Sequence, residues 1–142
     1  MTSPPVLDLR SARLIHGVLA AGIAVLFLVF AAVILPLKGP LLRGNPALPI
    51  ASSALALASA ASSACAIFFR RRLPGRGAEV PPESYWTPEI AGQAMMVWVL
   101  CEGAGVMAAV GFLLTGRWPP VAAAVFAWCL LMVFAPGRLA AG

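Results

Sequence analysis

The sequence predicts an all-α, polytopic membrane protein whose four transmembrane helices form two antiparallel hairpins. Hydrophobic residues make up 61% of the 142 residues and charged residues only 11%, whereas a soluble domain carries roughly 25% charged residues. A chain this short cannot cover its surface with so few charges unless lipid meets most of that surface. We expect one membrane domain over residues 1–142, with helices at about 14–37, 46–69, 88–115 and 119–135.

The first expected helix, 14–37, is an apolar run without a single charge, and a span needs about 20 such residues. Arg10 and Arg13 precede this run and Lys38 follows it. The run is longer than the roughly 7–15 apolar residues of a signal peptide, and no convincing cleavage site follows it. We therefore expect an uncleaved membrane anchor.

The second expected helix, 46–69, is rich in Ala and Ser and ends before three consecutive arginines. Asn45 suits the N-cap position and Pro46 suits the first helical turn. Small residues let helices approach closely in lipid, so a stripe of them predicts that this helix is the centre of helix packing. The stripe recurs every four residues, at Ala54, Ala58, Ser62 and Ala66.

The third expected helix, 88–115, follows a polar loop over residues 70–87. Thr87 is its expected N-cap, with Pro88 in the first helical position and Gly116 as its stop. The fourth expected helix, 119–135, has only about 17 residues, which is near the lower limit for a span.

Basic residues are distributed unevenly between the two ends of these helices, which predicts orientation. With the N-terminus inside, three basic residues (Lys38, Arg43 and Arg117) face outward. The other seven, which are Arg10, Arg13, Arg70, Arg71, Arg72, Arg76 and Arg138, face the cytoplasm. Both termini and loop 70–87 are therefore expected to be cytoplasmic. The preference for Arg over Lys, with abundant Ala, suggests a bacterial cytoplasmic (inner) membrane.

Glu102 is the residue that most needs an explanation, because it lies about 21 Å into the third expected helix, near the bilayer midplane. A carboxylate there is costly, so it should be protonated, paired or facing a polar cavity. Trp98 lies one turn away. On the second expected helix the matching depth falls near Leu55, which places Ser52, Ser53 and Ser59 within a turn of it. Gly105 and Ala109 would let another helix come close beside the carboxyl.

Two interpretations of Glu102 stay open. In the first, a neutral acid forms a hydrogen bond to a serine, to Trp98 or to a backbone carbonyl and holds the helices together. In the second, Glu102 binds a proton or a cation, with Trp98 and Ser59 as neighbours. The absence of a second ionisable group at this depth weakens any proton relay.

The second and third expected helices together resemble the hairpin of the rotary ATP synthase proteolipid, the c subunit. The corresponding features are the small residues of 51–66, the basic loop Arg70–Arg76 and the mid-membrane Glu102. This resemblance covers about half of the chain. It implies that Glu102 binds a proton within an oligomeric ring.

Other functional classes find little support in the sequence. The cysteines, Cys65, Cys101 and Cys129, form no C-x-x-C motif, and His16 is the only histidine, so we expect neither a metal nor a haem cofactor. No G-x-S-x-G, H-E-x-x-H, P-loop or dinucleotide fingerprint occurs. His16 is expected to be a solvated residue at the membrane interface.

The sequence therefore predicts a non-enzymatic accessory or assembly subunit, and the alternative is a proton- or ion-handling protein that uses Glu102. The expected partners are the lipid bilayer and either other membrane subunits or further copies of the chain. Nucleic acid is not expected, because the basic residues are dispersed between apolar runs.

Overall fold

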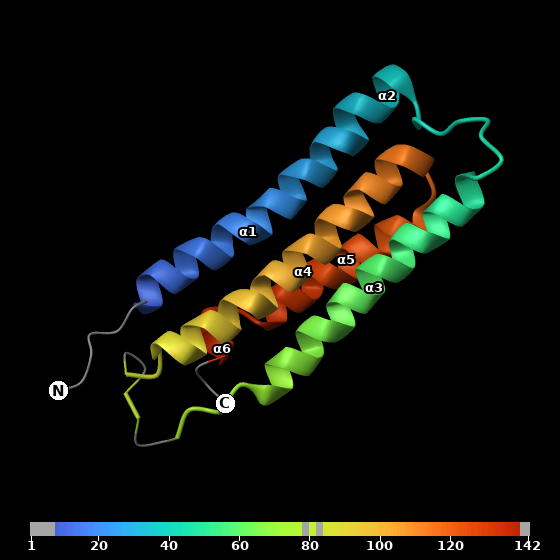
Figure 1. Ribbon diagram of the computed structural model, residues 1–142. Helices are drawn as coiled ribbons and strands as arrows, with labels where there is room; N and C mark the ends of the chain where they lie inside the picture. Colours follow the sequence, from blue (N-terminus) through green and yellow to red (C-terminus); the bar gives the residue numbers. More distant parts are fainter. Residues whose placement is uncertain (1–7, 78–79, 82–83, 140–142) are drawn as a thin grey trace.

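The computed structural model describes residues 8–77, 80–81 and 84–139, and all regular structure within them is helical, which confirms the all-α class. The helices run up and down, so that the start of α1 and the short helix α6 lie at the same end of the molecule (Figure 1). The extremes of the expected domain 1–142 and parts of loop 70–87 lie outside the described residues. The elements are α1 (Leu9–Val29), the π-helix η1 (Phe30–Ile34), α2 (Leu35–Lys38), α3 (Leu48–Arg72), α4 (Pro88–Thr115), α5 (Trp118–Val133) and α6 (Pro136–Leu139).

Three helical segments are long and apolar enough to cross a membrane. They are the continuous segment Leu9–Lys38, α3 and α4. The fourth long helix, α5, is equally apolar but has only 16 residues, which corresponds to about 24 Å of helix. The helices are thus consistent with a multi-pass membrane protein.

The ends of the helices follow local chemistry. Asp8 caps α1 by accepting a hydrogen bond from the Ser11 backbone N–H at 2.7 Å. Hydrogen bonding to the side chain of Ser11, and then to its backbone N–H, lowers the pKa of the Asp8 carboxyl. With Asp8 as its cap, α1 begins at Leu9, five residues before the expected start, and Arg10 and Arg13 lie within the helix. At α4, Thr87 is the N-cap and Gly116 adopts the left-handed conformation that ends the helix.

The central helix of the bundle is α4, which packs against α1, α3 and α5. It also carries the largest set of buried residues, many of them Ala or Gly. The expectation that the second helix is the packing centre is therefore wrong for the single chain. The reason is that α4 has small residues on several faces, among them Ala104, Gly105 and Ala108, so it can approach neighbours on more than one side.

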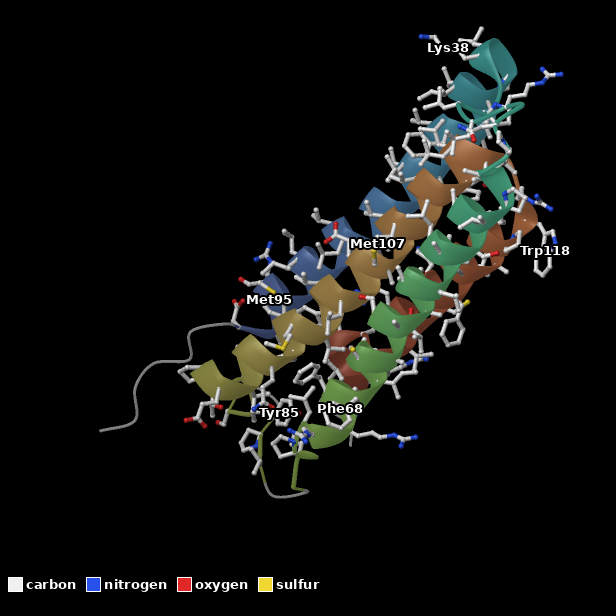
Figure 2. The ribbon with its side chains drawn as sticks, turned by 45° about the vertical axis from the view of Figure 1, so that its right-hand side comes forward. Lys38, Phe68, Tyr85, Met95, Met107 and Trp118 are labelled. Atoms are coloured by element: carbon white, nitrogen blue, oxygen red, sulfur yellow. The ribbon has the colours of Figure 1, made fainter. Side chains whose placement is uncertain are left out.

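Two ends of the bundle can be distinguished by their side chains. Lys38 lies at one end, beside α2, and Trp118 lies toward that end on α5, whereas Tyr85 and Phe68 lie at the other end, where α1 begins and α3 ends (Figure 2). We call these the α2 end and the terminal end. At the α2 end the loop after α2 packs on the end of α4: the Leu42 N–H donates to the Leu114 carbonyl at 2.8 Å.

Candidate functional site

Glu102 lies in the middle of α4, at the seam between α4 and α1. Its side chain is half-buried, and its Oε1 atom lies 3.8 Å from the position that a Cβ would take at Gly22 of α1. The carboxyl therefore faces the first helix, whereas the depth comparison along the sequence matched it with α3. The smallness of Gly22 leaves room for a carboxyl beside the α1 backbone.

The Glu102 carboxyl makes no hydrogen bond or ion pair with any residue that the structure describes. The two expected partners are engaged elsewhere. The Trp98 indole N–H donates to the Phe134 carbonyl at 2.8 Å, and the Ser59 hydroxyl donates to the Ala104 carbonyl at 2.8 Å. The structure thus does not bring Glu102, Trp98 and Ser59 together into one hydrogen-bonded site.

Gly105 and Ala109 occupy buried positions on α4. Ile23 of α1 packs directly against Gly105, where an added Cβ would lie 2.7 Å from the Ile23 Cδ1 atom. Because Ile23 follows Gly22 in α1, this close approach fixes the seam at which Glu102 lies. The seam is therefore shaped by a glycine on each helix.

The expected small-residue stripe of α3 divides in the structure. Ala66 is buried and Ser62 is half-buried, but Ala54 and Ala58 are exposed on this single chain. The buried face of α3 instead runs through Ser52, Ser59, Ser63 and Ala66.

Two serine hydroxyls join α3 to α4, whereas the buried hydroxyls of Ser52 and Ser63 have no hydrogen-bond partner among the described residues. Ser59 and Ser62 donate to the carbonyls of Ala104 and Leu100 on α4, at 2.8 and 2.9 Å. A hydroxyl that bonds to a facing helix in lipid adds attraction that an alanine cannot supply. The serine hydroxyls, together with small size, therefore position the contact between α3 and α4.

His16 and Trp98 form a buried polar cluster that the sequence did not predict. His16 is only 7% exposed, and its Nε2 lies 2.7 Å from the Leu131 carbonyl, to which it donates. Its ring also packs edge-on against Trp98, with ring centroids 5.6 Å apart. The expectation of a solvated interfacial His16 is therefore wrong.

His16 and Trp98 together cap the C-terminal end of α5. The last carbonyls of a helix have no partner within it, and Pro136 has no N–H to offer them. The side chains of His16 and Trp98 supply two donors, to the carbonyls of Leu131 and Phe134. An apolar environment requires such partners, so this cluster ties α1, α4 and α5 together.

The indole N–H of Trp86 is buried and has no hydrogen-bond partner in the part of the chain that the structure describes, and its ring centroid lies 6.1 Å from that of Trp98. The neighbouring Tyr85 hydroxyl donates to the Pro74 carbonyl at 2.8 Å. These aromatic side chains extend the cluster toward the loop that precedes α4.

No group of three His, Cys, Asp or Glu side chains able to hold a metal ion occurs within residues 8–77, 80–81 and 84–139. Cys101 is buried in α4, whereas Cys65 and Cys129 are exposed, and all three are free thiols. The cysteines therefore supply neither a disulfide nor a metal centre among the described residues.

Comparison with known proteins gives no further assignment. No family model matches the chain, and no curated protein or solved structure matches it. The contacts described above therefore carry the functional conclusion.

Proposed function

We propose that this chain is a non-enzymatic accessory or assembly subunit of a membrane complex, and that Glu102 anchors it to another polypeptide. In this proposal four helices cross a bacterial cytoplasmic membrane, with both termini inside. The observation that carries the proposal is the half-buried Glu102 carboxyl, which has no polar partner among the described residues of its own chain.

A carboxylate at the depth of Glu102 costs free energy unless a polar partner reaches it. It lies about 21 Å from the start of α4 at the helical rise of 1.5 Å per residue. Ionisable groups at such depth pair with one another or with carbonyls, or face a cavity. The basic residues of this chain lie at helix ends or in loops, so none of them is at the depth of Glu102.

The surface beside Glu102 suits contact with another helix. On α4, Met96 and Val99 are exposed large apolar side chains close to Glu102 in sequence, and Gly103 has nothing within 4 Å of an added Cβ. Ala54 and Ala58 are exposed on α3. Small residues on an accessible helix face allow the close backbone approach that drives association in lipid.

The proposal is tested by comparing the native size of wild type, Glu102→Leu and Glu102→Gln after extraction in mild detergent. Glu89 provides a matched control, because Glu89→Gln changes an exposed glutamate in the first turn of the same helix. We expect wild type and Glu89→Gln to migrate in a larger complex that Glu102→Leu fails to form. A monomeric wild type, or assembly that ignores Glu102→Leu, would contradict the proposal.

The second candidate is proton or ion binding at Glu102, as the resemblance to the c-subunit hairpin implies. The missing partner favours it too, since a carboxyl without a nearby cation is stable in lipid when it carries a proton. Infrared difference spectra of wild type against Glu102→Gln across the neutral pH range distinguish the two. A carboxyl that titrates, with assembly unaffected by Glu102→Gln, favours proton binding. A carboxylate that is ionised throughout favours pairing with a cation from another chain.

The proposed orientation has its own test. Single cysteines at Gly77 and Gly44, in a background without the native cysteines, should react with an impermeant thiol reagent from opposite sides of the membrane. We expect Gly77→Cys to label from the cytoplasmic side. Labelling of both positions from the periplasmic side contradicts the proposed topology.

A further inference from the structure

An apolar groove lies between α1 and α5, and Glu102 is not among its lining residues. It has a volume of about 350 Å³ and is lined by residues of the α1 segment between Ile23 and Ala31 and by Ala124, Val125 and Trp128 of α5. Its lining residues are all hydrophobic. Ligand pockets have volumes from about 300 Å³ upward, so the groove has room for a slender apolar ligand and not for a helix of about 10 Å diameter.

The groove is bounded on the side of the terminal end. The Trp128 indole N–H donates to the Ala20 carbonyl at 3.2 Å, which ties α5 to α1 at that level. Every lining residue of α1 lies beyond Ala20 toward the α2 end. At that side the groove reaches Ala31, which belongs to the π-helical turn η1. Such π-helical turns inside α-helices are frequent at functional sites.

Basic side chains lie beyond the groove at the α2 end. Lys38 follows Ala31 by seven residues and Arg117 precedes Ala124 by seven, which is about 10 Å of helix in each case. The segments that carry them touch, because a Cβ at Gly116 would lie 2.6 Å from Pro40. Of the acidic residues that the structure describes, Asp8 and Glu89 lie at the terminal end and Glu102 lies in mid-helix. The α2 end is therefore positively charged.

We propose that this groove binds one acyl chain of an anionic phospholipid whose phosphate lies against Lys38 and Arg117. One leaflet contributes about 15 Å to the hydrocarbon core of the bilayer. An acyl chain that descends from a phosphate at the α2 end therefore reaches the groove. Basic side chains at the membrane surface attract anionic headgroups, and the apolar lining accepts the chain. The proposal is independent of the function proposed for Glu102.

The test uses quenching of Trp128 fluorescence by phospholipids with brominated acyl chains, added to the full chain in mild detergent. The background is Trp118→Phe, which removes an exposed tryptophan at the same end, whereas Trp86 and Trp98 are fully buried. Brominated phosphatidylglycerol supplies the anionic headgroup, and brominated phosphatidylcholine supplies a zwitterionic one. We expect saturable quenching by phosphatidylglycerol at lower lipid concentrations than by phosphatidylcholine.

Two sets of variants separate the groove from the headgroup contacts. Ala31→Phe and Ala24→Phe fill the groove and should abolish saturable quenching, whereas Ala32→Phe, on an exposed residue outside the lining, should not. Lys38→Gln and Arg117→Gln should each weaken phosphatidylglycerol binding about five-fold, and Arg71→Gln at the terminal end should not. Equal binding of both lipids, or equal quenching in all three phenylalanine variants, would overturn the proposal.

Discussion

Ile23 of α1 packs directly on Gly105 of α4, so closely that a Cβ at residue 105 would lie 2.7 Å from the Ile23 Cδ1 atom. This contact holds the first helix against the centre of the bundle. It also places the adjacent Gly22 beside the Glu102 carboxyl. The geometry of the seam is therefore sensitive to side-chain volume at position 105.

Gly105→Leu should reduce the free energy of unfolding, because the added side chain would overlap the Ile23 side chain. Overpacking of this kind typically costs about 1–3 kcal/mol. Thermal and denaturant unfolding in detergent measure the change. Ile23→Ala should restore part of the loss, and Gly103→Ala, where nothing lies within 4 Å of the added Cβ, is the control. A Gly105→Leu variant as stable as wild type would contradict the close packing of Ile23 on Gly105.

Trp98→Phe should destabilise the bundle by removing the donor to the Phe134 carbonyl. A buried acceptor left without its partner typically costs about 1–3 kcal/mol. Trp118→Phe is the matched control, because Trp118 is 75% exposed. The same unfolding measurements compare the two variants, and equal stability would show that the capping of α5 by Trp98 contributes nothing.

Neighbouring residues of α3 should respond differently to the same substitution. Ser59→Leu should destabilise the chain by about 1–3 kcal/mol, because Ser59 is fully buried and bonded to Ala104. Ala58→Leu should leave the unfolding of the isolated chain nearly unchanged, because Ala58 is exposed. The reverse order of stability in detergent would place the packing face of α3 on the stripe that includes Ala58.

Tyr85 should ionise at a higher pH than a free tyrosine, whose pKa is about 10. Burial raises the pKa of its hydroxyl, and the charge of Arg70 opposes the shift only in part. Because burial raises the pKa of Tyr85 in the folded state, the folded state favours the neutral hydroxyl. The resulting contribution of Tyr85 to the free energy of unfolding is present below about pH 10 and is lost as the pH rises through the folded pKa. Tyr85 is the only tyrosine in the chain, so a tyrosinate absorbance titration reports it directly. A midpoint at or below the ordinary value would contradict the burial.

Much of the fold is readable from local signals in the sequence. The long apolar runs predict α1, α3 and α4, and Thr87, Pro88 and Gly116 mark the ends of α4 at the residues where the structure has them. The structure begins α1 five residues before the start that apolar length predicts, because Asp8 caps the helix and Arg10 and Arg13 continue it beyond its apolar part. Apolar length alone does not record such extensions.

The partners of the polar side chains were not predictable in the same way. Trp98 bonds to a carbonyl 36 residues away, and His16 to one 115 residues away. Both acceptors are backbone atoms, which carry no sequence signature. An expected helix start at residue 14 also sets His16 at the membrane interface, whereas α1 begins at Leu9 and takes His16 into the bundle. Pro136, which has no N–H, is a sequence signal that a carbonyl near the end of α5 needs a donor from elsewhere.

Photo-crosslinking beside Glu102 tests the proposed assembly role most directly. A photoreactive residue at Val99, which is exposed on α4 close to Glu102, should form an adduct with another membrane polypeptide in native membranes. The same residue at Val18, an exposed position on α1, is the control. We expect the adduct at Val99 to disappear in the Glu102→Leu background and to persist with Glu89→Gln. An absence of adduct at Val99, or an adduct unchanged by Glu102→Leu, would contradict the role of Glu102 as the anchor.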